Sequence, residues 1–119
     1  MKIYVAHRYS CNGEVLEVLS SIGRAIQIGN ELARKGHFPY VPHLDCLMAI
    51  QDNKKIPVSW YYENSMAWLK CCDAIFIVDP NDIDQSSGVK AEFDYAVSKG
   101  YTVYYYTNEI SSVRRKNYD

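Results

Sequence analysis

Four short apolar and aromatic runs divide the chain, at residues 2–7, 37–41, 74–78 and 101–106. Each run has the length and the β-branched or aromatic content that is typical of a β-strand. Between the runs, apolar residues recur at helical spacing in three segments, at residues 14–35, 58–71 and 87–99. The pattern therefore predicts strands that alternate with helices.

This alternation predicts an α/β domain with a small, mostly parallel sheet and right-handed crossovers. Residues 2–6 and 74–78 are almost continuously apolar, as strands are when helices cover both faces of a sheet. Pro39 interrupts the second run, which is typical of an edge strand. We expect a flavodoxin-like, three-layer fold with strand order 2-1-3-4, formed by residues 1–119 as a single domain.

In this order the first and third strands are neighbours. The chain adds its second strand on one side of this pair and its fourth strand on the other side, so the direction of strand addition reverses between them. Open α/β sheets bind ligands in the crevice beyond the carboxyl ends of the strands at such a point. The loop after the first strand carries His7, Arg8 and Ser10, and the loop after the third begins at Asp79. His43 follows the second strand at the same edge. The sequence therefore predicts a ligand site formed by these loops.

Glu92 breaks the apolar pattern of the third helical segment. The apolar positions are Val89, Phe93, Ala96 and Val97, and Glu92 lies on or beside the same face. We expect it in the first turn, facing the crevice, where burial raises a carboxyl pKa and the helix N-terminus lowers it. The expected result is an ionised, poorly solvated carboxylate, which suits a nucleophile toward a sugar carbon. A glutamate that only stabilises the helix dipole is the structural alternative.

Ser86, Ser87 and Gly88 open the same helical segment. A serine at a helix N-cap commonly satisfies free backbone N–H groups. The same combination of hydroxyls, N–H groups and helix dipole can also hold a phosphate. The sequence leaves both interpretations open.

Composition and charge exclude several classes of function. The formal net charge is −1 and the pI is about 6.3, so no basic field favours polymeric nucleic acid or an anionic membrane surface. No apolar run approaches the roughly 18 residues of a membrane helix, and the N-terminal residues resemble a strand and not a signal peptide. The four cysteines have no zinc-ligand spacing. We expect a cytoplasmic protein with reduced thiols and no metal.

Tyrosine is unusually frequent, with 11 residues among 119. Rings that carry a hydroxyl suit half-buried surfaces such as pockets and subunit interfaces. Tyr4 and Tyr9 flank the expected crevice. Tyr104, Tyr105 and Tyr106 place rings on both faces of the fourth strand, where they serve packing or self-association. We expect a homodimer or a higher homo-oligomer.

Three segments of the chain are similar to segments of a known enzyme family. They are IYVAHRYS at residues 3–10, ENSMAWLKCCDAIFIVD at 63–79 and SSGVKAEFDYA at 86–96, the last with an S-x-G-x-x-x-E pattern. Over about residues 1–106, the chain resembles the nucleoside 2-deoxyribosyltransferase superfamily, including its 2′-deoxynucleoside 5′-monophosphate N-glycosidase branch.

The resemblance implies cleavage or exchange of an N-glycosidic bond without a cofactor. Glu92 stands where the family has its nucleophile, which attacks the anomeric carbon of a 2-deoxyribose and displaces the base. A second base or water then takes the sugar from the glycosyl-enzyme ester. Tyr4 matches a pocket tyrosine, and Ser86 matches a phosphate contact of the monophosphate branch. The implied substrate is a deoxynucleotide or deoxynucleoside, with Arg8 and Ser10 as further phosphate ligands.

The chain departs from the family on its second helical segment. Where family members commonly have an aspartate that orients or protonates the substrate, this chain has Asn64 or Ser65, depending on the alignment. The acid would then come from Asp79, Asp82 or Asp84. Without such an acid, the domain would be a catalytically weak or inactive nucleotide-binding or sensor protein of the same fold.

Further side chains are candidates for contact with the base. The second helical segment opens with Trp60, Tyr61 and Tyr62, one of which would stack on the base unless they serve core packing or an interface. His43 and Asp45 follow the second strand and would line the base site, unless His43 is a packed or exposed loop residue.

Overall fold

The computed structural model describes residues 1–9 and 14–105. Its strands are β1 (Lys2–Ala6), β2 (Phe38–Tyr40), β3 (Ala74–Ile77) and β4 (Thr102–Tyr105). Its helices are α1 (Val15–Arg34), α2 (Asp45–Asp52), α3 (Val58–Leu69), α4 (Asp82–Gln85) and α5 (Ser87–Ser98), with a short 3₁₀ helix, η2 (Pro42–Leu44), before α2. None of the described helices is long and apolar enough to cross a membrane.

The four strands form one sheet in the order β2-β1-β3-β4, and every pairing is parallel. Tyr4 of β1 is in register with Tyr40 of β2 and Ile75 of β3, and Phe76 of β3 is in register with Tyr104 of β4. The predicted α/β class, flavodoxin-like layering and strand order are confirmed. Because all strands run in one direction, their carboxyl ends share one edge of the sheet.

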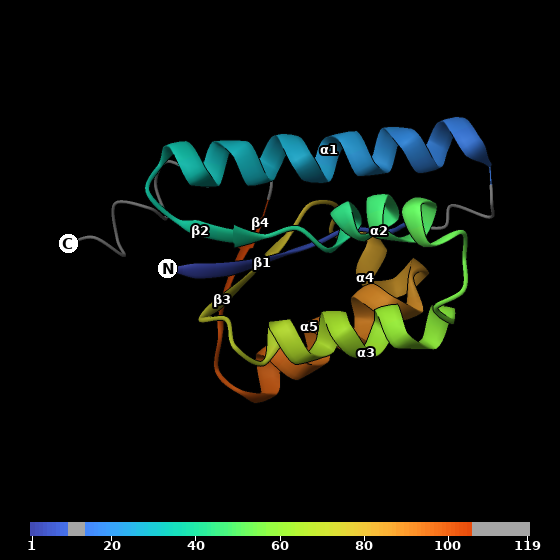
Figure 1. Ribbon diagram of the computed structural model, residues 1–119. Helices are drawn as coiled ribbons and strands as arrows, with labels where there is room; N and C mark the ends of the chain where they lie inside the picture. The colour runs from blue at the N-terminus through green and yellow to red at the C-terminus, as the bar shows by residue number, and fades with distance from the viewer. Residues whose placement is uncertain (10–13, 106–119) are drawn as a thin grey trace.

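Helices cover both faces of the sheet, with α1 on one side and α3 and α5 on the other (Figure 1). On the α1 face, Ile3, Val5 and Phe76 belong to one buried cluster with Ile28 and Leu32 of α1. Neighbouring side chains of a strand point to opposite faces of its sheet. The alternate strand residues therefore need a second apolar layer on the other face.

The second buried cluster provides that layer. Tyr4, Ala6 and Ile77 pack there with Leu69 of α3 and Val89 of α5. A strand that is covered on both faces needs an apolar residue at every position, which explains the continuous apolar runs of β1 and β3.

Two helices lie in segments where the apolar pattern predicts none. Helix α2 has no fully buried residue, and its Leu47, Met48 and Ile50 are exposed. Periodicity marks a helix by the apolar stripe that it buries, so α2 leaves no such signal. Helix α4 has four residues, too few for a helical period to be recognised.

The tyrosines of the fourth strand and its approach contribute mainly to packing within the chain. Tyr104 is 3% exposed, and its hydroxyl lies 3.2 Å from Met1 Sδ. The Tyr101 hydroxyl donates a hydrogen bond of 2.9 Å to the Leu69 carbonyl, and Tyr105 packs against the cluster of α3 and α5. Tyr104 is therefore a core residue and no part of an interface, Tyr106 lies outside the described residues, and self-association stays a prediction.

Candidate functional site

A cavity of about 880 Å³ lies at the carboxyl edge of the sheet. Its wall is formed by the segments after β1 and β2, by α2 and the connection to α3, by α3, and by α4 with the start of α5. In Figure 1, α2 and α4 both lie at this end of the molecule. The cavity is therefore in the place where the strand order predicts a ligand crevice.

Eight of the predicted site residues line this cavity. They are Tyr4, His7, Arg8, His43, Ser86, Ser87, Gly88 and Glu92. The lining does not include Asp79, Trp60 or Asn64. Ser10 lies outside the described residues. The fold thus brings together residues from β1 and the segment after it, from the segment after β2, and from the first two turns of α5.

Glu92 and Tyr4 meet in the wall of this cavity. Tyr4 is fully buried in β1, and its hydroxyl donates a short hydrogen bond to Glu92 Oε2. Helix α5 begins at Ser87, so Glu92 is its sixth residue and lies in the second turn. The expectation of a first-turn position is therefore wrong. The field of the helix N-terminus, which falls off within the first turn, has correspondingly less influence on the carboxyl group.

Burial dominates the protonation of this pair. It raises the pKa of Glu92 to about 7, and the hydrogen bond from Tyr4 offsets only part of that rise. Burial and the nearby Glu92 also raise the pKa of Tyr4, so the phenol keeps its proton and remains a hydrogen-bond donor. Near neutral pH the Glu92 carboxyl is only partly ionised, whereas the sequence argument expected full ionisation.

This raised pKa predicts that Glu92 destabilises the fold at alkaline pH. The unfolded chain ionises Glu92 near 4.5 and the folded chain near 7, so its contribution to stability is greatest below pH 4.5 and is lost as the pH rises through about 7. We expect Glu92→Gln to raise the free energy of unfolding by about 2–3 kcal/mol at about pH 8 and to change it little at about pH 4.5. Urea denaturation at both pH values measures the difference. An equal effect at both would contradict the burial argument.

The start of α5 presents polar groups to the same cavity. The Ser86 hydroxyl accepts a hydrogen bond of 3.3 Å from the Val89 backbone N–H, so Ser86 is the N-cap of α5. Ser87 and Gly88 follow in its first turn and also line the cavity. The two interpretations of this segment are therefore compatible, since the structural cap lies in the wall of the cavity.

Asp82 is the centre of a buried polar cluster that the sequence argument noted only as one possible acid. Its side chain is 1% exposed, and Oδ2 lies 2.9 Å from His7 Nδ1 and accepts a 3.0 Å hydrogen bond from the Arg8 backbone N–H. Its Oδ1 accepts a hydrogen bond from Arg8 Nη1 at 3.3 Å. Asp79 Oδ2 accepts from the same Nη1 at 3.3 Å. Two carboxylates therefore compensate the charge of Arg8. Asp79 does not itself line the cavity, and it influences the charge there by pairing with Arg8.

The two histidines of the cavity are buried and neutral near pH 7. His43 Nε2 donates a 3.1 Å hydrogen bond to the Arg8 carbonyl, and burial lowers the pKa of His43 to about 4. Burial also lowers the pKa of His7, although Asp82 opposes that change. Among the described residues, His7 Nε2 and His43 Nδ1 have no hydrogen-bond partner. Both rings are therefore packed residues of the cavity wall that contribute no positive charge to it.

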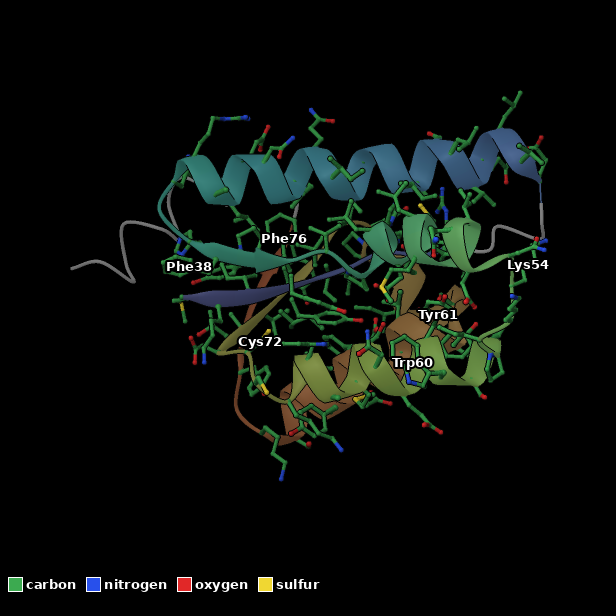
Figure 2. All side chains as sticks on the ribbon, in the orientation of Figure 1. Phe38, Lys54, Trp60, Tyr61, Cys72 and Phe76 are labelled. Atoms are coloured by element: carbon green, nitrogen blue, oxygen red, sulfur yellow. The ribbon has the colours of Figure 1, made fainter. Side chains whose placement is uncertain are left out.

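Helix α3 presents Tyr61, Tyr62 and Ser65 to the cavity, and Trp60 is not among the lining residues. Of the three aromatic residues that the sequence offers for stacking on a base, the two tyrosines therefore line the cavity. Trp60 packs edge-on against Tyr61, with ring centroids 5.1 Å apart, and both are labelled in Figure 2. The Asn64 amide donates to the Tyr40 hydroxyl at 3.3 Å. Of the two candidates for the missing family aspartate, Ser65 is therefore the residue that faces the cavity.

Helix α2 and the connection after it form a part of the wall of which the sequence predicts only Asp45. Besides Asp45, Cys46 and Ala49 of α2 line the cavity, and so do Lys54 and Ile56 beyond it. Burial raises the pKa of Asp45. Because α2 buries no apolar stripe, the sequence carries no helical pattern over this segment. A helix beside the strand ends could therefore not be predicted here.

Within the described ranges, no group of three or more His, Cys, Asp or Glu side chains is arranged to hold a metal ion.

Comparison with known proteins places the chain in a family without assigning it an activity. No curated protein is similar enough to the chain to count as a relative. One family model, described as a domain of unknown function (DUF7768), matches residues 1–106. The chain therefore belongs to this DUF7768 family.

Proposed function

We propose that this protein cleaves or exchanges the N-glycosidic bond of a 2′-deoxynucleoside 5′-monophosphate or a deoxynucleoside, with Glu92 as the nucleophile. The observation that carries the proposal is the Glu92 carboxyl group, enclosed in the wall of the cavity and oriented by Tyr4. The resemblance of residues 3–10, 63–79 and 86–96 to nucleoside 2-deoxyribosyltransferases supports the same role. The family match itself names no activity.

In the first step, a Glu92 carboxylate oxygen forms a bond to the anomeric carbon as the bond from that carbon to the base breaks. The electron pair of the broken bond leaves with the base, which takes up a proton. Tyr4 holds Oε2 by its hydrogen bond, so the carboxylate reacts from a fixed orientation. A pKa near 7 leaves a useful ionised fraction at neutral pH while keeping the carboxylate basic enough to react.

In the second step, water or another base attacks the anomeric carbon and the ester bond to Glu92 breaks. The carboxylate is restored, and the attacking water or base gives up its proton to solvent. For the first step, Asp45 is the candidate proton donor to the departing base, because it lines the cavity and burial raises its pKa. It replaces Asp79 in that role, since Asp79 does not line the cavity.

A second candidate function is nucleotide binding without turnover, as in a sensor. It is favoured by Ser65, because α3 presents a hydroxyl to the cavity where the resemblance implies an aspartate. A hydroxyl near pH 7 does not supply a proton to a leaving group as a carboxylic acid does. The two functions share the cavity and differ in whether the bond is broken.

Base release separates the two functions. We expect the purified protein to release free base from at least one deoxynucleoside monophosphate or deoxynucleoside, or to exchange it when a second base is added, as measured by liquid chromatography. The apparent rate should rise with pH through about 7 as Glu92 ionises. Binding of these compounds without any release or exchange would favour the sensor and contradict the enzyme.

A further inference from the structure

Lys54 stands out in the connection between α2 and α3. It lies in the wall of the cavity, and Figure 2 shows it at the same end of the molecule as α2. Its φ angle is +60°, and that of Asn53 is +56°. Two consecutive residues other than glycine thus adopt the left-handed conformation at one cavity wall.

The end of α2 explains only the first of these two conformations. The Asn53 N–H bonds to the Ile50 carbonyl and the Lys54 N–H to the Ala49 carbonyl, both at 3.2 Å, which closes the helix. Asparagine is well tolerated at the left-handed position of such a cap. Lysine lacks the short polar side chain by which asparagine can bond the neighbouring backbone and offset the strain of this conformation. Where α1 and α5 end, the chain has Gly36 and Gly100 at positive φ.

The charges of the cavity give Lys54 a role. Arg8 and Lys54 are the lysine and arginine side chains in the described lining. Arg8 is paired with Asp79 and Asp82, whereas Lys54 forms no ion pair with any described residue. Glu92 and other carboxylates of the lining oppose the entry of an anion. An anionic ligand therefore depends on the uncompensated ammonium group of Lys54.

We propose that Lys54 binds the phosphate group of the substrate and thereby selects a nucleoside monophosphate over the uncharged nucleoside. This inference rests on the proposed function, because it assumes that the ligand of the cavity is a deoxynucleotide or deoxynucleoside. The Ser86 and Ser87 hydroxyls of the α5 start line the same cavity and supply further phosphate donors. The strain at Lys54 is retained because glycine, the better residue for this backbone, carries no charge.

Calorimetric binding to full-length protein tests this selection, in a Glu92→Gln background that prevents turnover. The ligands are the deoxynucleoside monophosphate and the deoxynucleoside of the same base. We expect Lys54→Gln to weaken monophosphate binding about tenfold or more, as for loss of one charge-assisted hydrogen bond, and to leave nucleoside binding unchanged. Lys55→Gln is the matched control, because this exposed neighbour does not line the cavity. It removes the same charge and should leave both affinities unchanged.

A structural role would give a different pattern. Lys54→Gly should raise the urea midpoint of unfolding, because it relieves the strained conformation, and should still weaken monophosphate binding as Lys54→Gln does. The inference is overturned if Lys54→Gln weakens both ligands equally or neither, or if no monophosphate binds. Turnover without a Lys54 effect would overturn this inference alone. A Lys54-dependent preference for the monophosphate without base release in the Glu92-containing protein would overturn the proposed enzymatic function alone.

Discussion

Glu92→Gln is expected to reduce base release by roughly a thousandfold or more, because removal of a covalent nucleophile leaves only binding and orientation to assist the reaction. Glutamine keeps the size of the side chain and an oxygen that accepts the Tyr4 hydrogen bond. It cannot form the ester with the sugar. The rate of base release at saturating substrate measures the effect, and unchanged substrate affinity would show that the cavity is intact.

Asp94→Asn is the matched control for this loss. Asp94 is on the same helix and 58% of its side chain is exposed, where it pairs with Lys90 at 3.4 Å. The substitution removes one carboxylate from α5, as Glu92→Gln does, at a site outside the cavity. An exposed pair of this kind contributes little to stability. If both variants retained normal rates, Glu92 would not be the nucleophile.

Asp82→Ala is expected to destabilise the fold by about 2–4 kcal/mol, because it leaves hydrogen-bond donors of His7 and Arg8 without their acceptor. Asp82 is fully buried and holds His7 Nδ1, the Arg8 backbone N–H and the Arg8 guanidinium together. Without it, the part-buried Arg8 N–H and the buried ring of His7 each lose a hydrogen-bond partner. Urea denaturation at neutral pH gives the change in free energy of unfolding.

Asp84→Ala provides the comparison within the same short helix. Asp84 is exposed and lies two residues beyond Asp82 in α4. We expect its substitution to change stability by no more than about 0.5 kcal/mol. If Asp82→Ala were as mild as Asp84→Ala, the cluster around Asp82 would not hold the strand ends together as the structure indicates.

The sheet could be predicted because helices cover both of its faces, so that its central strands need an apolar residue at every position. The continuous apolar run of β3 and the interruption of β2 by Pro39 reveal a covered centre and an edge directly from residue types. The strand order 2-1-3-4 follows from this division into central and edge strands together with right-handed crossovers. Helix α2 leaves no comparable signal, because Leu47 and Ile50 are exposed and no face is buried.

The candidate site could be predicted to the extent that strand ends define it. Glu92 and Ser86 were found because a polar residue on an apolar helix face and a serine before a helix are local signals. The Asp82 cluster and Lys54 depend on contacts that no spacing encodes. Asp82 meets His7 across 75 residues of chain, and Lys54 reaches the cavity through a backbone conformation that its residue type does not favour.

The most direct test of the central claim is the capture of the sugar on Glu92. The wild-type protein would be mixed with a deoxynucleoside monophosphate in excess, quenched rapidly in acid, digested and examined by peptide mass spectrometry. We expect deoxyribose phosphate attached to the peptide of α5 at Glu92, and none in Glu92→Gln. Release of base in the wild type with no adduct, or with the adduct on a different carboxylate, would contradict it.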